Sequence, residues 1–236
     1  RFAGDSASGQ LALFEQLGFR ADAVQAVMQA FGSAAAGAAS TRTHLIVFAG
    51  HGIDEAGASP RFPAAAEGKA CDLIKLRLDA LAQQAKSGER LTVLASAAPG
   101  ADILLHEVCA ESKLHSHLCL PMPAEAVASL VFATASPWRS RFLAIVKAHE
   151  GSVLQLADDE RLPRWLQGRP GIDPWERGNR WVMHLAQTWD AQRVTLLVLW
   201  DGQDDGRAGG TAHMVRMARA LGKFEFEIID SRQLLA

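Results

Sequence analysis

Strand-like and helix-like hydrophobic patterns alternate along the chain from about residue 41 onward. Short runs of β-branched and apolar residues, typical of strands, occur at 43–49, 91–96, 117–120, 153–156, 194–200 and 224–229. Between them, apolar residues at three- and four-residue spacings predict helices over 64–86, 101–112, 124–131, 136–149, 173–189 and 211–221. This alternation favours a Rossmann-like, doubly wound α/β fold with a mostly parallel sheet and helices on both faces.

The segment from Val194 to Trp200 consists of β-branched and apolar residues throughout. A strand of that composition must be covered on both faces, so we expect it to be central in the sheet. Asp173 and Pro174 suit the N-cap and the first position of the helix that precedes this strand, and Gly222 suits the C-cap of the helix that follows it.

The first 40 residues have a different composition. Apolar positions between Leu11 and Phe31 predict two short helices, and Ser33 to Ser40 are almost entirely Ala, Gly and Ser, which is typical of a linker. We therefore expect an N-terminal helical segment with its linker at 1–40 and the main domain at 41–236. Because the first residue is Arg1 and not Met, we expect a piece of a longer protein.

Composition narrows the class of protein. The 24 Lys and Arg residues nearly balance the 26 Asp and Glu residues, which argues against nucleic acid or a membrane surface as a partner. No apolar run reaches the ~20 residues that span a bilayer. Cys71, Cys109 and Cys119 are odd in number and lie in apolar surroundings, which indicates reduced thiols and a cytoplasmic protein. We predict no metal site, because His115 and His117 lack an evident third ligand.

Glycine-rich breaks follow three of the predicted strands and lead toward helices. They are Gly50-His51-Gly52, then Ser96 to Asp102 with Gly100 inside it, then Asp201-Gly202 leading to Gly209-Gly210-Thr211. The carboxyl ends of parallel strands meet at one edge of a sheet, where backbone N–H groups and helix N-termini favour anions. We therefore predict a single crevice for a negatively charged ligand. The alternative is that these glycines only turn the chain.

Roles in this crevice follow from residue type. The predicted phosphate cradle consists of Gly50, Gly52, Gly100, Gly209, Gly210 and Thr211. The predicted polar contacts are His51, Arg61, Ser96, Asp102 and Asp201, with Glu107 and Asn179 directed to a ribose and Trp200 to a base. Asp102 and Glu107 are five residues apart and so do not share a helix face, and no spacing indicates a catalytic constellation.

Taken in order, these motifs resemble the SLOG superfamily, the Rossmann-like group named for the Smf/DprA proteins and the LOG phosphoribohydrolases. The similarity lies in GHGID and RFP (50–54, 61–63), SAAPGADILLHE (96–107), LPMP (120–123), WRSRF (138–142), GNR (178–180) and LWDGQ to AGGTAHMV (199–215). The resemblance is closest to the modules appended to tetratricopeptide-repeat or cyclase-containing bacterial proteins. It implies a domain that senses a nucleotide-derived signalling molecule, such as an ADP-ribose derivative, in bacterial defence.

The resemblance also separates binding from turnover. LOG-type enzymes carry an acidic residue soon after the Thr of the Gly-Gly loop, whereas Thr211 is followed here by Ala212, His213 and Met214. Our leading hypothesis is a non-catalytic nucleotide sensor without a cofactor, which works as a homo-oligomer or with a fused effector or repeat domain. The alternatives are a nucleoside-monophosphate phosphoribohydrolase or other N-glycoside hydrolase, in which Glu107 or Asp201 replaces the missing carboxylate, and an assembly domain with an empty crevice.

Overall fold

The computed structural model describes residues 42–54, 60–204, 206 and 209–235. The predicted helical segment and linker at 1–40 lie outside the described residues, and that division of the chain stays a prediction. None of the helices in the described part is long and apolar enough to cross a membrane.

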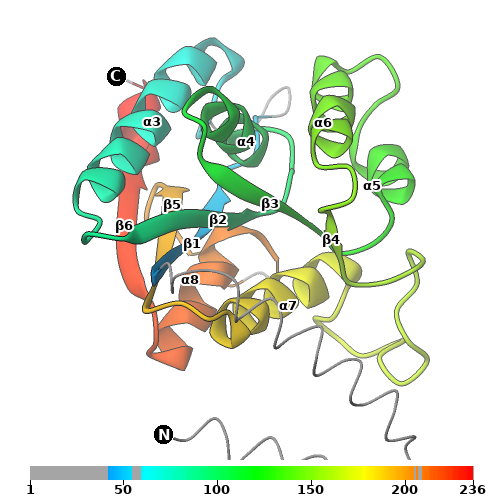
Figure 1. The fold of residues 1–236 in the computed structure, drawn as a ribbon. Helices are drawn as coiled ribbons and strands as arrows, with labels where there is room; N and C mark the ends of the chain where they lie inside the picture. Colours follow the sequence, from blue (N-terminus) through cyan, green and yellow to red (C-terminus); the bar gives the residue numbers. More distant parts are fainter. Residues whose placement is uncertain (1–41, 55–59, 205, 207–208, 236) are drawn as a thin grey trace, which may run out of the picture. The chain divides into compact units, whose positions relative to one another are not determined.

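The core element is a six-stranded, entirely parallel sheet in the order β4-β3-β2-β1-β5-β6 (Figure 1). The strands are β1 (Arg42–Gly50), β2 (Glu89–Ala95), β3 (His115–Leu120), β4 (Leu154–Gln155), β5 (Arg193–Trp200) and β6 (Glu225–Asp230). The helices are α3 (Glu67–Gln83), α4 (Ala101–Glu111), α5 (Ala124–Val131), α6 (Pro137–Ala148), α7 (Pro174–Thr188) and α8 (Gly210–Leu221), with 3-10 turns η1 (Ala64–Ala66) and η2 (Ser231–Leu235).

Side-chain alternation along β1 builds two hydrophobic cores, one on each face of the sheet. Ile46 and Phe48 pack in the core that includes residues of α3 and α4, whereas Leu45 and Val47 pack in the core that includes residues of α7 and α8. Figure 1 shows α3 and α4 above the sheet and α7 and α8 below it. Because a strand has a side-chain period of two, this arrangement covers both faces, and the predicted doubly wound α/β fold is confirmed.

The strand order reverses beside β1. Strands β1 to β4 follow one another outward on one side, and the chain then returns to place β5 and β6 on the other side of β1. In open α/β sheets, ligands bind outside the carboxyl ends of the strands at such a reversal. The topology therefore predicts a ligand site near the carboxyl ends of β1 and β5, where the first and third glycine-rich breaks begin.

Every strand and helix that the pattern predicts from residue 43 onward is present, with ends that differ by a few residues. The expectation that the strand at 194–200 is central needs correction, because β5 lies between β1 and the edge strand β6. Its residues 195–200 are nevertheless buried, since helices cover both faces. The predicted strand at 153–156 shortens to Leu154–Gln155, and the sequence patterns did not predict η2.

The crossing of β1 and α4 depends on a residue without a side chain at Gly50. A Cβ at this position would lie 2.2 Å from the Cβ of Ala101 and 3.2 Å from the ring of Phe48. We therefore expect Gly50→Ala to lower the free energy of unfolding by roughly 2 kcal/mol or more, as for other overpacked cores. Adding Ala101→Gly removes the closest contact and should restore part of the loss, measured by urea denaturation.

Gly68 in α3 provides the matched control, because a Cβ there meets no heavy atom within 4 Å. Gly68→Ala should leave the protein as stable or raise its stability by up to about 1 kcal/mol, since Ala favours helix. If Gly50→Ala behaves like Gly68→Ala, the close approach of β1 and α4 is incorrect.

Candidate ligand-binding site

A cavity of about 330 Å³ lies at the carboxyl ends of β1, β2 and β3. All three glycine-rich breaks contribute to it: Gly50 from the first, Ser96 and Asp102 from the second, and Gly210 and Thr211 from the third. The remaining lining residues are Phe48, Ala49, Ala97, Ala98, Cys119, Leu120, Pro121, Val127, Val131, Trp175, Gly178, Asn179, Trp181, Val182 and Met214. The three breaks therefore meet at one cavity, and the binding of a negatively charged ligand there stays a prediction.

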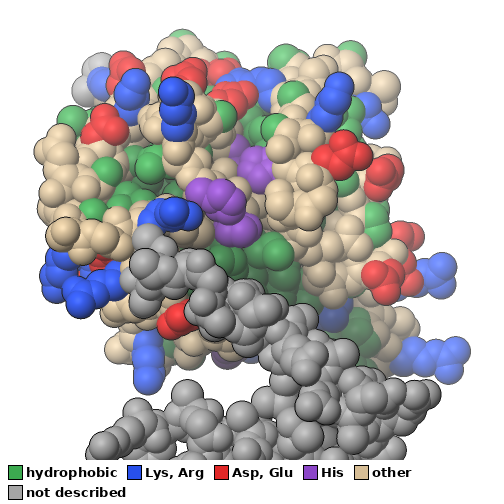
Figure 2. Space-filling model, viewed as in Figure 1, with side chains coloured by type: hydrophobic (Ala, Val, Ile, Leu, Met, Phe, Trp, Pro, Cys, Tyr) green, Lys and Arg blue, Asp and Glu red, His purple; other side chains and the backbone are tan. Residues whose placement is uncertain are grey.

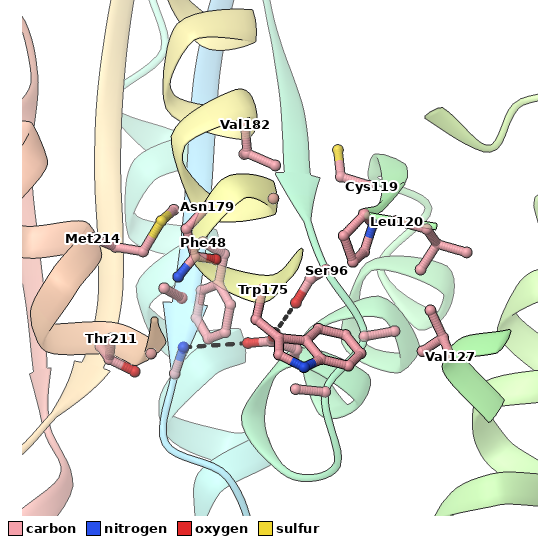
Figure 3. Close-up of a pocket in the computed structure, with 18 of the residues that line it drawn as sticks. Phe48, Ser96, Cys119, Leu120, Val127, Trp175, Asn179, Val182, Thr211 and Met214 are labelled. Carbon is pink, nitrogen blue, oxygen red and sulfur yellow. Dashed lines mark hydrogen bonds between the residues drawn. The ribbon is translucent and has the colours of Figure 1, made fainter. Parts of the chain in front are cut away.

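The walls of this cavity are mostly apolar (Figure 3). Leu120 and Val127 line one side, and Phe48 and Met214 the other. Among the described lining residues none is Lys, Arg or His, and hydroxyl, carboxylate and amide groups come from Ser96, Asp102, Asn179 and Thr211. A cavity with few polar groups and apolar walls suits a flat organic moiety better than a bare phosphate.

Asp102 ties the first two breaks together. Its Oδ1 accepts a hydrogen bond from the backbone N–H of Gly50 at 3.2 Å, and its Oδ2 accepts one from the Ser96 hydroxyl. The backbone N–H of Ala98 donates to it as well. The residue lies in the first turn of α4, where the helix dipole favours a carboxylate. Burial nevertheless raises the pKa of Asp102 to about 6, because desolvation outweighs these hydrogen bonds.

Gly52 and Gly100 pair with each other rather than with the cavity. They form an isolated antiparallel bridge, in which Ile53 N donates to Pro99 O at 3.0 Å and Ala101 N donates to His51 O at 3.1 Å. Gly100 has φ +114°, and a Cβ there would lie 2.5 Å from the backbone nitrogen of Ile53. Neither Gly52 nor Gly100 belongs to the described lining of the cavity, so the predicted phosphate cradle is smaller than expected.

His51, Arg61 and Asp201 form a cluster that joins the first and third breaks outside the main cavity. The Arg61 guanidinium donates to both oxygens of Asp201 at 2.8 and 3.1 Å, and the backbone N–H of Asp201 donates to His51 Nε2 at 3.1 Å. Burial, together with the nearby Arg61, lowers the pKa of His51. None of these three side chains belongs to the described lining of the main cavity. The predicted contacts from them to a ligand in that cavity are therefore not supported.

Glu107 and Trp200 also lie away from the cavity, contrary to their predicted places. Glu107 accepts two hydrogen bonds from the guanidinium of Arg141 on α6, at 2.8 and 2.5 Å. Trp200 is 5% exposed, packs in the α7 and α8 core, and donates its indole N–H to the carbonyl of Gln203. Both side chains find their hydrogen-bond partners within the protein. The ribose and base contacts expected from them are therefore wrong for this cavity.

The third break presents the N-terminus of α8 to the cavity. Gly209 is the N-cap, with φ +78° and no side-chain cap, and its N–H donates to His213 Nδ1 at 3.2 Å. Gly210 has φ +72° and is exposed, whereas Thr211 is 6% exposed. The first N–H groups of a helix lack partners within that helix, so this end of the cavity favours a negative group.

The sequence patterns missed the contribution of α7, apart from Asn179. Trp175, Gly178, Asn179 and Val182 all line the cavity, and they recur at three- and four-residue spacings. This spacing places them on one face of the helix, a signal available in the sequence. Trp175 is 37% exposed at the start of α7, and its indole lies at the cavity (Figure 3). A Cβ at Gly178 would lie 2.9 Å from Pro121, so that glycine allows α7 to approach the end of β3.

Histidine side chains gather near the middle of the face shown in Figure 2. His115 and His117 pack edge to face with ring centroids 4.4 Å apart, and His117 contacts Trp189 in the same way at 4.9 Å. Burial lowers the pKa of His117 to about 4. Within the residues that the structure describes, no group of three or more His, Cys, Asp or Glu side chains could hold a metal ion.

Similarity to known proteins is found by structure and not by sequence. No protein-family model matches the chain, and no curated protein does. A solved structure of DNA processing protein A from Helicobacter pylori, described for its single-stranded DNA binding mode, is similar over 81% of this chain and 79% of that chain, with 14% identity and a TM-score of 0.35. The expectation that nucleic acid is no partner is contradicted by this single-stranded DNA-binding neighbour, and we withdraw it.

Burial of the Asp102 carboxylate makes the stability of the protein depend on pH. Because the folded-state pKa of Asp102 is about 6 against an ordinary value of 3.8, its ionisation favours the unfolded state. Its contribution to stability is fully present below the ordinary pKa and is lost as the pH rises through 6. Relative to Asp102→Asn, the wild type should lose roughly 2 to 3 kcal/mol of unfolding free energy between pH 4 and pH 7.

Urea denaturation of both proteins across this pH range measures the difference. The comparison cancels other titrating groups, including His106, whose pKa burial lowers to about 4. If the unfolding free energies of the two proteins change in parallel with pH, burial does not raise the pKa of Asp102.

Proposed function

We propose that this chain is a ligand-binding domain of the SLOG type, which holds a nucleotide-derived molecule without turning it over. The observation that carries the proposal is one cavity, at the reversal of strand order, to which all three glycine-rich breaks contribute. Its volume of about 330 Å³ is at the lower end of the range for small-molecule sites. A site of this kind suits part of a nucleotide, with the rest at the mouth.

The two ends of the cavity suit the two ends of a nucleotide. Trp175, Leu120 and Val127 offer apolar surface for a base or sugar ring. Gly210 and Thr211 begin α8, whose N–H groups and dipole favour phosphate. This placement keeps the third break as the phosphate site, whereas the backbone N–H groups of Gly50 and Ala101 at the first two breaks bond within the protein.

Two observations favour binding over hydrolysis. Glu107 pairs with Arg141 and Asp201 with Arg61, so neither carboxylate that the hydrolase alternative requires lies at the cavity. The residues after Thr211 also include no carboxylate in the first turn of α8. The only carboxylate in the described lining is Asp102, which is 6% exposed, so a developing positive charge on a ribose beside the exposed Gly210 would lack a neighbouring anion to stabilise it.

Calorimetric titration tests the proposal with AMP, NAD, ADP-ribose and cyclic ADP-ribose, together with a single-stranded DNA oligonucleotide. We expect at least one nucleotide to bind, and we expect Gly210→Asp to weaken that binding at least tenfold. The added carboxylate would repel phosphate at the start of α8. Chromatography of the same mixtures should show no release of free base.

Gly168→Asp is the matched control for this variant. Gly168 has the same φ of +72°, a Cβ there also meets no heavy atom within 4 Å, and it does not line the cavity. It should bind like the wild type. If no nucleotide gives heat on titration, the proposal is rejected. If both variants weaken binding equally, the third break is not the phosphate site. Release of free base would show that the domain hydrolyses its ligand.

A further inference from the structure

The inner part of the cavity holds a carboxylate that has no cationic partner among the described residues. Asp102 is 6% exposed, and its hydrogen bonds come from the neutral donors Gly50 N–H, Ser96 hydroxyl and Ala98 N–H. The described lining contains no Lys or Arg side chain that could neutralise it. A buried carboxylate without a counter-charge is costly, and the hydrogen bonds by which Asp102 connects the first two breaks offset only part of that cost.

The hydrogen-bonding capacity of this carboxylate is not exhausted. Two carboxylate oxygens offer about four acceptor positions, and the protein fills three of them. A carboxylate that faces a cavity and has an acceptor position left favours a ligand that brings a donor. An N–H or O–H group of the ligand would complete the set, whereas a carbonyl or phosphate oxygen would not.

Charge decides which end of a nucleotide enters first. A phosphate placed beside Asp102 would bring two anions together in apolar surroundings, where their repulsion is poorly screened. At the mouth, by contrast, Gly210 is exposed and the N-terminus of α8 favours a negative group. The phosphate end therefore belongs at the mouth, and the uncharged end belongs inside.

The apolar walls distinguish a base from a sugar. A ribose carries hydroxyl groups around its ring, and those that face Phe48, Leu120 and Met214 would remain unpaired. A nucleobase has two apolar faces and keeps its polar groups on its edge. Such a ring can lie flat between the walls while a single edge meets the carboxylate.

We propose that Asp102 is the specificity-determining residue of this site and accepts a hydrogen bond from an amino or imino N–H of a nucleobase that enters the cavity edge first. This inference rests on the proposed nucleotide-binding function. It orients the ligand, with the sugar and phosphate directed toward Gly210 and Thr211. It also requires the base to present an N–H donor on the edge that enters the cavity.

The test compares the parts of a nucleotide as separate probes. Adenosine, guanosine and cytidine each carry an exocyclic amine and no phosphate, whereas ribose 5-phosphate and inorganic phosphate carry no base. By calorimetry, we expect at least one of these nucleosides to bind, with an affinity within about tenfold of its 5′-monophosphate. Neither ribose 5-phosphate nor phosphate should bind measurably.

Asp102→Asn should weaken the best nucleoside about tenfold or more, because it replaces a charged acceptor by a neutral amide of the same shape. Asp54→Asn is the matched control. That carboxylate accepts hydrogen bonds from the backbone N–H groups of Arg61 and Phe62, which lie outside the three breaks, and it does not line the cavity. Near-ultraviolet circular dichroism checks that both variants are folded.

The outcomes separate this inference from the proposed function. If a nucleotide binds but none of the three nucleosides does, or if ribose 5-phosphate binds in their place, the inward base is rejected while the ligand-binding function stands. Unchanged nucleoside affinity in a folded Asp102→Asn variant also rejects it. If neither nucleotides nor nucleosides bind, the proposed function fails first and takes this inference with it.

Discussion

The hydrogen bonds of the buried Asp102 carboxylate hold the site together. They connect the end of β1, through Gly50 N–H, to the end of β2, through the Ser96 hydroxyl, while the residue itself belongs to α4. This connection brings the first two breaks to one point and places a negative group at the cavity. The same two breaks also approach each other closely. A side chain at Gly50 would collide with Ala101 of α4, and a side chain at Gly100 would collide with the backbone of the first break.

A second consequence concerns which backbone groups remain for a ligand. At the first two breaks, the backbone N–H groups of Gly50, Ile53 and Ala101 donate hydrogen bonds within the protein. The Arg61 guanidinium is held by Asp201 in the same way. The cavity lining therefore includes fewer glycines than the sequence predicted, and it consists of the N-terminus of α8, one face of α7, the apolar end of the sheet and the Asp102 carboxylate of α4.

The sequence was sufficient for the fold and for the edge of the sheet at which the cavity lies. Period-two and period-3.6 patterns predicted the elements, and glycines after strands predicted the edge where a cavity lies. It was insufficient for side-chain direction. Glu107 and Trp200 come from elements that flank the cavity but point elsewhere, because Arg141 and the α7 and α8 core satisfy them. Net charge is a total over the whole chain and does not describe local surfaces, so the exclusion of nucleic acid that was based on it is withdrawn.

The most direct test of the account is a crystal structure of the protein with the nucleotide that binds it most tightly. The account predicts that nucleotide in the cavity between Ser96, Asn179 and Thr211, with its phosphate beside the start of α8. A nucleotide bound instead in the smaller pocket lined by Arg61, Ser231 and Arg232, with the cavity at the ends of β1 to β3 empty, would contradict it.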